Sequence, residues 1–509
     1  MKKLFILLIS GLFVLSCDSQ KSISNTVQAE DIVIKIIQIN DVYEIDAINN
    51  GKSGGLARVA WIRDSIAAEN PNTWYFLAGD FVNPSLLGTI KVDGKRLQGK
   101  QMIEVLNASK VDLVTFGNHE FDISEADLQD RINESNFKWT SANTLQVTPE
   151  GNKPFYKETS AGKEYFPDHM VFDAFNSKGD KVSFGIFSVT LPSNPKPYVF
   201  YGDIFDEAVR SYNEVSKKSD FVLGMTHVSL DQDQEIARRL QDVPLIMGGH
   251  EHNNMEVKVG KSVIIKADAN VVSLYVHTLT YQPETKKLDI DSELVMVTDK
   301  FKSKPEVQAV VEKWNQVLDD NLKTIVDDPY EVIYNAVEPL DGTDTASRSE
   351  QTNLGGIIGE SMSLAYGHEC DAAFSNGGGI RIDDRLAGDI TVKDIFRILP
   401  FGGSALKVEM TGKLLRETLD FGLSTSGKGS YLQWYNIERS PKGEWIVKGQ
   451  LLDDNKNYNI VLNDFLMLGL DIPFLKDDNP GVLNIYTPES DEVAADLRKA
   501  IIHYFKTSK

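Results

Sequence analysis

One stretch in the first third of the chain places several polar side chains directly after a short apolar run. Residues 114–116 are Val-Thr-Phe, the sequence Gly-Asn-His-Glu follows at 117–120, and Asp122 comes two positions later. Removing this many polar groups from water is costly unless something pairs with them, and a metal ion is a common partner. The stretch therefore predicts a metal-binding turn at the end of a buried strand.

The same arrangement recurs through the first half of the chain, where five short apolar runs read as strands. These runs cover residues 32–39, 75–78, 111–116, 221–225 and 244–247. A metal-ligand residue type follows each of them, and the set is Asp41, Asp80, Asn118, His227, His250 and His252. In α/β folds, ligands bind at the carboxyl ends of strands. We therefore expect these side chains to share one site.

The candidate ligands carry oxygen and nitrogen atoms and no thiolate, which suits Zn, Mn, Fe or Co. They are too many for one tetrahedral ion, so we expect two divalent ions bridged by a carboxylate, with Asp80 as the bridge. Such a pair clamps the attacking and leaving oxygens of a phosphoryl displacement and lowers the pKa of a bound water. The neighbouring His119, oriented by Asp122, can stabilise charge or protonate the leaving oxygen.

Length and charge limit the classes of protein to consider. A chain of 509 residues is too long for one core, so we expect two domains. Their boundaries are placed at 32–302 and 325–509, with a linker helix in residues 303–324 that starts with a capping box of Ser303 and Glu306. A net charge of -21 without a basic stripe argues against nucleic acid polymers as partners.

The N-terminus predicts export. Two lysines precede an apolar stretch at residues 4–15, which is too short to span a bilayer as a mature helix. The sequence Val-Leu-Ser-Cys that ends at Cys17 resembles a bacterial lipoprotein cleavage box, although an ordinary signal peptide containing a Cys is the alternative. We expect residues 1–16 to be the signal peptide, Cys17 to be lipidated, and residues 17–31 to be a flexible tether in the cell envelope, at the periplasmic face or the cell surface. The membrane is then a partner only through this lipid anchor.

Together, these motifs resemble the calcineurin-like metallophosphoesterases. The matching motifs are Gly-Asp at 79–80, Gly-Asn-His-Glu at 117–120, His227 and Gly-His-Glu-His at 249–252. Within that superfamily the chain is similar to the 5′-nucleotidase and UDP-sugar hydrolase family, because C-terminal motifs match as well. The resemblance implies an α/β (α+β) protein with a four-layer β-sandwich metallophosphoesterase domain flanked by helices, a linker helix, and a C-terminal substrate-binding domain. It also implies rotation of the second domain about hinge residues at the ends of the linker helix.

The resemblance also implies roles for the site residues. One metal would be bound by Asp41, Asp80 and His252. The other would be bound by Asp80, Asn118, His227 and His250. His119 and Asp122 match the catalytic pair of the family. The family usually has Asp-x-His at the first motif, but this chain has Tyr43 in the His position. Tyr43 either ligates through its phenolate, which favours a harder or trivalent metal, or leaves the place to water.

The second domain supplies the expected nucleotide pocket. An Asn-Gly-Gly-Gly-Ile-Arg run occupies residues 376–381, where glycines allow close backbone approach and arginine offers a fork of donors for phosphate. By the resemblance, Arg348, Asn376 and Arg381 contact the nucleotide, Phe401 and Phe465 stack on the base, and Asp471 holds the ribose hydroxyls. Two aromatic faces can clamp a base with little regard for its hydrogen-bonding edge.

These features predict an exported two-metal phosphohydrolase. The leading reaction converts a nucleoside 5′-monophosphate into nucleoside and phosphate by metal-activated hydroxide. Hydrolysis of UDP-sugars or 2′,3′-cyclic nucleotides is the alternative among enzymes. A catalytically impaired nucleotide-binding lipoprotein, with Tyr43 as the sign of a decayed site, is the alternative from another class. A sulfur-oxidation hydrolase of similar fold fits less well, because the nucleotide pocket is matched.

Overall fold

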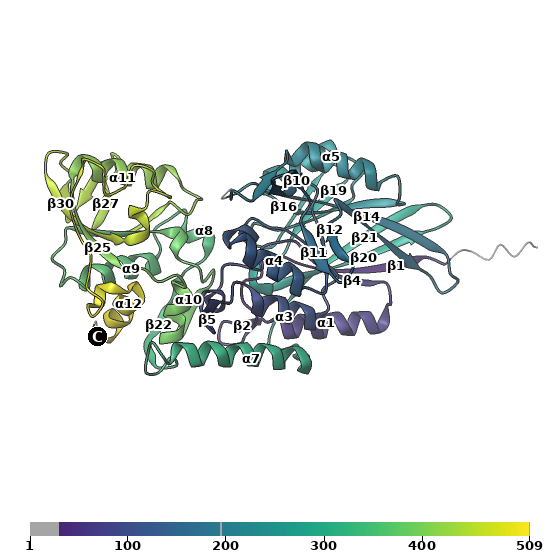
Figure 1. Ribbon diagram of the computed structural model, residues 1–509, viewed down its shortest axis with the longest axis horizontal. Coiled ribbons are helices and arrows are strands. Elements are labelled where there is room, and N and C mark those ends of the chain that lie inside the picture. The colour runs from purple at the N-terminus through teal and green to yellow at the C-terminus, as the bar shows by residue number, and fades with distance from the viewer. Residues whose placement is uncertain (1–29, 194–195, 508–509) are drawn as a thin grey trace, which may run out of the picture.

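The computed structural model describes residues 30–193 and 196–507 of the chain. The predicted signal peptide and Cys17 lie outside the described residues. Figure 1 shows two bodies side by side, with the long helix α7 (Pro305–Leu322) running along the first body towards the second. Across the described ranges, no helix combines the length and the apolar character needed to span a membrane.

Two six-stranded sheets form the centre of the first body. The first sheet has the order β21-β20-β1-β4-β7-β8, with β1, β4, β7 and β8 parallel and β20 and β21 antiparallel to their neighbours. Its strands are β1 (Ile32–Ile39), β4 (Thr73–Leu77), β7 (Leu113–Thr115), β8 (Lys138–Thr140), β20 (Ser273–Gln282) and β21 (Lys287–Met296).

The second sheet has the order β13-β14-β16-β17-β19-β18, with four parallel strands in the centre and an antiparallel strand at each edge. Its strands are β13 (His169–Phe175), β14 (Lys181–Thr190), β16 (Phe221–His227), β17 (Leu245–Gly248), β19 (Ser262–Lys266) and β18 (Met255–Val259).

The β-branched residues of β1 show how the layers form. Ile34 and Ile36 join a core between the two sheets, whereas Ile37 and Ile39 join a core against helices. Side chains that follow one another in a strand point to opposite faces, so a continuous apolar run serves both cores. The helices on the outer face of the first sheet are α1 (Leu56–Glu69), α3 (Lys100–Ser109), α4 (Glu125–Glu134) and α7. Helices α5 (Ile204–Val215) and α6 (Leu230–Arg239) cover the second sheet. The predicted four-layer sandwich is confirmed.

The second body has a five-stranded sheet with the order β26-β23-β30-β25-β31. Its strands are β26 (Leu432–Tyr435), β23 (Ala372–Asn376), β30 (Asn457–Asn463), β25 (Ala405–Thr411) and β31 (Val482–Tyr486). Helices α9 (Asn353–Leu364) and α12 (Leu497–Thr507) pack on one face, and α11 (Gly412–Ser424) packs on the other. The sheet and its helices give this body two apolar cores of its own.

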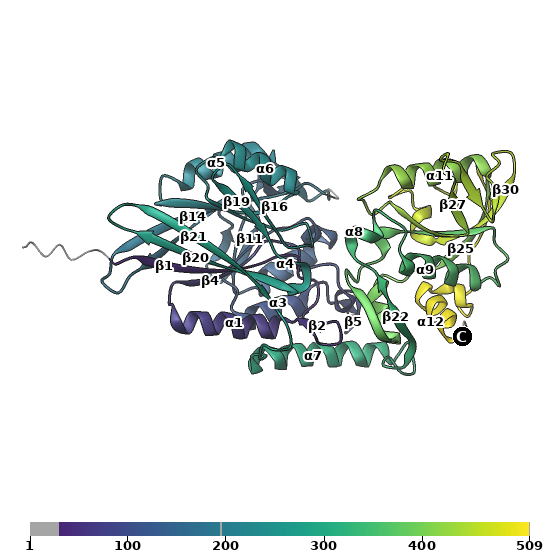
Figure 2. The same ribbon diagram turned by 180° about the vertical axis from the view of Figure 1, so that it is seen from behind.

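The junction between the bodies is partly apolar. A two-stranded ribbon of β22 (Val332–Asp341) and β24 (Arg385–Thr391) leads into α10 (Val392–Ile398). Val392 and Phe396 of α10 join the same buried cluster as Val307 and Trp314 of α7. Figure 2 shows β22 next to the end of α7. The second body is therefore attached through packed side chains as well as through the chain itself.

The predicted capping box at the start of α7 is wrong. The helix begins at Pro305 with Lys304 as its N-cap, and no described side chain caps it. The Lys304 carbonyl instead accepts hydrogen bonds from the N–H groups of Val307 and Gln308, at 3.1 and 2.9 Å. Proline suits the first helical position, so the helix starts one residue later than a Ser303 cap requires.

Candidate metal and catalytic site

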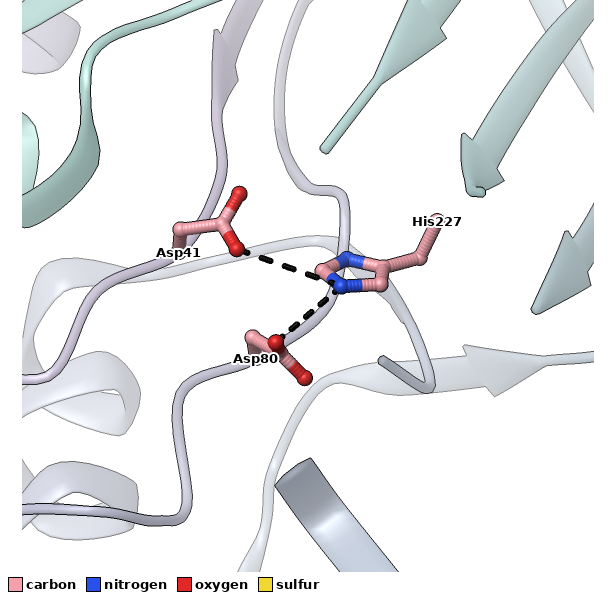
Figure 3. Close-up of side chains that lie close together, drawn as sticks. All are labelled: Asp41, Asp80 and His227. Atoms are coloured by element: carbon pink, nitrogen blue, oxygen red, sulfur yellow. Dashed lines mark ion pairs between the residues drawn. The ribbon is translucent and has the colours of Figure 1, made fainter. Parts of the chain in front are cut away.

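Three buried side chains from the ends of strands in both sheets meet at one point (Figure 3). Asp41 follows β1, Asp80 follows β4, and His227 is the last residue of β16, and their ligand atoms lie within 4.8 Å of one another. His227 Nε2 is 3.1 Å from Asp80 Oδ2 and 3.9 Å from Asp41 Oδ1. The strand-end positions therefore bring residues 186 positions apart, from 41 to 227, into one cluster.

The turns after β1 and β4 hold a strained but locked backbone. Asp41 and Asp80 have φ values of 53° and 57°, in the left-handed region that Asp tolerates better than most residues. Asp41 N–H donates to the Gly79 carbonyl at 3.1 Å, and Val42 N–H donates to the Asp80 carbonyl at 2.8 Å. Backbone in this region costs of order 1–3 kcal/mol per residue and persists only where the surroundings fix it. These bonds hold the backbone from which both carboxylates project.

Two glycines leave room for the imidazole of His227. A Cβ atom at Gly79 would lie 2.7 Å from His227 Nδ1, and one at Gly249 would also lie 2.7 Å from it. Cβ atoms in proteins essentially never come this close to another atom, and the His227 ring cannot move away because it is fully buried. Glycine at both positions is therefore a steric requirement of the cluster.

The protonation of His227 suits a metal ligand. Its Nδ1 donates to the Ala78 carbonyl at 2.7 Å, so the lone pair of the neutral ring is on Nε2, which faces the carboxylates. Burial lowers the pKa of His227, but the Asp80 and Asp41 carboxylates outweigh it and raise that pKa to about 9. The two carboxylates thus favour a positive charge next to Nε2. A divalent cation supplies that charge and neutralises both carboxylates.

The remaining predicted ligands surround this cluster. The backbone N–H of His250 donates to Asp41 Oδ2 at 2.9 Å, and the His250 ring lies 5.6 Å from that of His227. His252 Nε2 is 3.4 Å from Asp41 Oδ1. Asn118 Oδ1 is a buried atom with no hydrogen-bond partner in the described part of the chain, and His227 Nε2 faces only carboxylate oxygens. Buried polar atoms are normally paired, so the unpaired amide oxygen and the nitrogen among carboxylates fit a pair of divalent metals.

Tyr43 lies inside the site. Its hydroxyl is 3.2 Å from Asp80 Oδ2, 3.4 Å from Asp41 Oδ1 and 3.2 Å from His252 Nε2. Burial raises the pKa of the phenol well above its usual value, and the two carboxylates raise it further. The phenol is therefore positioned to donate a hydrogen bond to a carboxylate or to meet a cation.

The predicted catalytic pair is formed on a 3-10 helix, η1 (His119–Asp122), that directly follows Asn118. His119 Nδ1 lies 2.6 Å from Asp122 Oδ2, and the His119 backbone N–H donates to Asp80 Oδ1 at 2.7 Å. Burial raises the pKa of Asp122, but the hydrogen bond from His119 and the charge of Arg381 outweigh it and lower that pKa. An ionised Asp122 accepts a hydrogen bond from the Nδ1–H group of His119. The other ring nitrogen of His119 therefore stays available to contact a substrate.

Glu120 has a structural role that sequence reasoning missed. Its buried carboxylate accepts hydrogen bonds from the backbone N–H groups of Asp80, Phe81, Val82 and Gly117, at 2.5–3.0 Å. Burial raises the pKa of Glu120 to about 7, and the Asp80 charge adds to the rise. The carboxylate fastens the turn after β4 to the turn after β7. Its position directly behind a buried strand was the signal available in the sequence.

Lys266 was missed in the same way. It is fully buried at the end of β19, and its Nζ lies 2.8 Å from Asp233 Oδ2 and 2.8 Å from the Gly249 carbonyl, and also contacts Glu251. These contacts hold the loop that carries His250 and His252. A lysine inside the apolar run Val-Ile-Ile-Lys-Ala was the signal, because a buried charge needs a specific partner.

Two arginines of the second body, Arg348 and Arg381, lie close enough to interact through their charges, and the charge of Arg381 also reaches Asp122 of the first body. The Nε atoms of Arg348 and Arg381 are buried, and neither has a hydrogen-bond partner in the described parts of the chain. Arg348 Nη2 lies 2.5 Å from Asp344 Oδ1. Burial lowers the pKa of Arg381, and the like charge of Arg348 lowers it further. Two close guanidinium groups with free donors suit a phosphate.

Of the other predicted substrate residues, Phe401 and Asp471 lie near Arg381. The Arg381 guanidinium carbon is 5.7 Å from the ring centre of Phe401, and Asn376 Nδ2 donates to Asp471 Oδ2 at 2.8 Å. Phe401 is 55% exposed and Phe465 is 37% exposed. Large aromatic side chains left this open are available to stack on a ligand.

Comparisons with known proteins agree with this geometry. The family model described as "Calcineurin-like phosphoesterase" matches residues 34–254, and that described as "5'-nucleotidase, C-terminal domain" matches residues 332–477. The chain is 26% identical to the Trifunctional nucleotide phosphoesterase protein YfkN of Bacillus subtilis (strain 168), over 77% of this chain and 29% of that protein. It is also 26% identical to the 5'-nucleotidase of Bos taurus, over 84% of this chain and 79% of that protein.

Among solved structures, the chain is similar to the 5'-nucleotidase precursor from Thermus thermophilus. The TM-score is 0.74 at 22% sequence identity, over 94% of this chain and 97% of that one. The shared fold extends over both bodies, and both family models match in the expected order. The chain therefore belongs to the 5′-nucleotidase family of calcineurin-like metallophosphoesterases, which are metal-dependent phosphoric ester hydrolases.

Proposed function

We propose that this protein hydrolyses nucleoside 5′-monophosphates to nucleosides and phosphate. The observation that carries the proposal is the placement of the buried Nε donors of Arg348 and Arg381 beside the His119–Asp122 pair and the exposed ring of Phe401. This arrangement would supply an anion site, a proton donor and a stacking surface to one bound nucleotide. Relatives named 5'-nucleotidase, such as the bovine protein, support the same substrate class.

The metal ligands would come from the first body. The residues that fit this role are Asp41, Asp80, Asn118, His227, His250 and His252, with Tyr43 beside them. Despite burial, the His227 charge lowers the pKa of both Asp41 and Asp80, so both supply anionic oxygens at neutral pH. When bound, the two divalent metals supply an activated water and neutralise phosphate charge.

The second body would bind the nucleotide. Arg348 and Arg381 donate to phosphate oxygens, and Phe401 and Phe465 hold the base between their faces. Asp471, oriented by Asn376, accepts hydrogen bonds from the ribose hydroxyls. Because aromatic faces do not read the edge of a base, we expect activity on several bases.

His119 would move the proton that the reaction needs. Asp122 accepts from Nδ1 of the protonated ring, and the other ring nitrogen donates its proton to the 5′ oxygen as the bond from phosphorus to that oxygen breaks. The oxygen of water bonds to phosphorus as the bond to the 5′ oxygen breaks, the nucleoside leaves with the proton from His119, and phosphate remains with the arginines. The proton that the attacking water releases restores the one that His119 gave up. One water is therefore consumed per nucleotide and no further reactant is needed.

The direct experiment identifies the products formed by protein stripped of metal and reloaded with Zn, Mn, Co or Fe, by chromatography together with a phosphate assay. The substrates are AMP, UDP-glucose and 2′,3′-cyclic AMP, which separate the nucleotidase from the UDP-sugar and cyclic-nucleotide alternatives. We expect AMP turnover with at least one metal. Retained AMP binding without turnover of any substrate would instead indicate a nucleotide-binding lipoprotein with an impaired site.

The protein is proposed to work outside the cytoplasm, anchored through Cys17. The basis is the apolar stretch at residues 4–15 and the Val-Leu-Ser-Cys sequence that ends it. Mass spectrometry of the N-terminal peptide tests this, because the mature protein should begin at a Cys17 that carries the mass of a lipid. A mature N-terminus without that added mass would refute the lipid anchor.

A further inference from the structure

The second body touches one of the proposed metal ligands directly. His252 Nδ1 lies 2.7 Å from Asp383 Oδ2, although the two residues are 131 positions apart. His252 belongs to the loop between β17 and β18 of the first body, and Asp383 lies just before β24 in the second. Both side chains are 14% exposed. The contact forms only while the two bodies lie against each other.

The Asp383 carboxylate is oriented by its own body before it meets His252. Its Oδ1 accepts from the backbone N–H of Asp344 at 2.8 Å, at the start of the short helix α8 (Asp344–Ser347). The other oxygen, Oδ2, is therefore held towards the first body. Figure 1 shows α8 at the side of the second body that faces the first. A fixed carboxylate costs less entropy to pair than a mobile one.

The contact with Asp383 decides which nitrogen of His252 can bind a metal. With its Nδ1 proton donated to Asp383, the neutral ring has its lone pair on Nε2, which lies 3.4 Å from Asp41 Oδ1 and 3.2 Å from the Tyr43 hydroxyl. Metal-binding histidines usually donate their other N–H to a carboxylate or carbonyl, which fixes the tautomer and the ring orientation. His227 has such a partner in the Ala78 carbonyl of its own body. His252 has Asp383 of the other.

We propose that Asp383 is a positioning residue that completes the metal site from the second body, so that metal affinity and closure of the two bodies are coupled. The inference rests on the proposed metal site. Coupling of two equilibria is reciprocal. If closure strengthens metal binding through His252, metal binding must favour closure by the same factor.

Other contacts between the bodies lack this property. Glu44 Oε1 lies 3.6 Å from Arg397 Nε, and Asn253 Nδ2 donates to Thr345 Oγ1 at 3.4 Å. They hold the bodies together without touching a ring nitrogen of a proposed ligand. Replacing Asp383 therefore tests whether the second body positions the metal site, because the other two contacts hold the bodies together without touching a proposed ligand.

The variant that tests the proposal is Asp383→Asn. Asp383 has a φ of 45°, a left-handed conformation that Asn also adopts, so the backbone is retained. The amide oxygen can still accept from Asp344, which turns the NH2 group towards His252 Nδ1. That nitrogen must then accept, and the ring proton moves to Nε2, which can no longer bind a metal. Asp389→Asn is the matched control, because Asp389 is bonded to Asn335 of its own body.

The experiment measures Zn²⁺ affinity by competition with a chromophoric chelator, and the radius of gyration by small-angle scattering with and without metal. In Asp383→Asn we expect one of two metals to bind about 10–100-fold more weakly, with affinities unchanged in Asp389→Asn. Metal should compact the wild type and compact Asp383→Asn less. Thermal unfolding confirms that both variants fold.

Equal metal affinities in the wild type and Asp383→Asn would overturn the inference and leave the proposed function standing. Weaker binding in Asp383→Asn with the same compaction as the wild type would overturn the coupling. A wild-type protein that binds no pair of metals would overturn the proposed function itself. Asp383→Ala repeats the test without an amide that can form new hydrogen bonds. This variant should also bind one of the two metals more weakly.

Discussion

Tyr43 introduces a phenol into a site otherwise made of carboxylates, an amide and imidazoles. Its hydroxyl is as close to Asp80 as to His252, at 3.2 Å from each. The carboxylates and burial favour the neutral phenol, whereas a nearby cation stabilises the phenolate. The balance between these effects depends on the charge of the metal, and we therefore propose that this residue selects between metals.

Replacing Tyr43 should change the metal preference of the protein. An imidazole ligand suits Zn and Fe, so in Tyr43→His we expect affinity for Zn relative to Mn to rise by about 10-fold or more. Chelator competition with each metal, together with phosphate release from AMP, measures the change. Tyr43→Phe is the comparison, since it removes only the hydroxyl. Unchanged metal content and rate in Tyr43→His would show that this position selects nothing.

The positions of Asp41, Asp80 and His227 could be predicted because each follows a buried strand, where an unpaired polar group is costly. The roles of Glu120 and Lys266 were missed, since nothing in the sequence says which partners their buried charges find. Asp383 was beyond prediction, because its role depends on a contact between two bodies that no local pattern encodes.

At the scale of elements, a buried polar chain links the two sheets of the first body. His277 of β20 lies 2.9 Å from Gln38 Oε1 of β1 and 2.8 Å from the Ser292 hydroxyl of β21. Gln38 Nε2 in turn donates to the carbonyls of Gly248 and Ile265 in the second sheet, at 3.1 and 2.9 Å. These hydrogen bonds tie the two sheets together where Gly248 leads into the loop that carries His250 and His252.

The buried His277 predicts that the stability of the protein depends on pH. Burial lowers the pKa of His277 to about 3, whereas in the unfolded chain it titrates near 6.5. Between these values the unfolded chain binds a proton that the folded one does not, so stability falls as the pH falls below 6.5. At pH 5 the loss is about 2 kcal/mol at 1.36 kcal/mol per pKa unit.

Urea unfolding at pH 7 and pH 5 measures this loss in the wild type and in His277→Gln, which keeps polar contacts but cannot take up a proton. We expect the variant to have a lower free energy of unfolding than the wild type at pH 7. Between pH 7 and pH 5, its free energy of unfolding should fall by about 2 kcal/mol less than that of the wild type. The same pH dependence in both proteins would assign the acid sensitivity to other groups.

Most of the central elements could be predicted from periodicity and composition. The strand at residues 32–39 is found with the predicted bounds, and the linker helix predicted within residues 303–324 is found at 305–322. Only the cap of that helix was wrong, because proline fixed its first residue. The order of strands within each sheet, with β20 placed beside β1, follows from pairing across the whole first body and has no local signal.

At the scale of the whole molecule, the proposed reaction needs both bodies. The metal ligands and His119 come from the first, while Arg348 and Arg381 come from the second. The bodies meet through an apolar junction at α10 and through polar contacts such as His252–Asp383. In the proposed mechanism, closure of the bodies would bring the two arginines and the Asp383 carboxylate to the metal site in a single movement.

The most direct test of this account counts the metal ions in reloaded protein by mass spectrometry and measures AMP hydrolysis on the same sample. The account predicts two ions per wild-type chain together with turnover. It also predicts that Asp80→Asn, which removes a carboxylate that would hold the metals, loses metal and lowers the rate at least about 100-fold. A wild-type protein that binds AMP but holds no metal and releases no phosphate, or an Asp80→Asn variant with full metal content and rate, would contradict it.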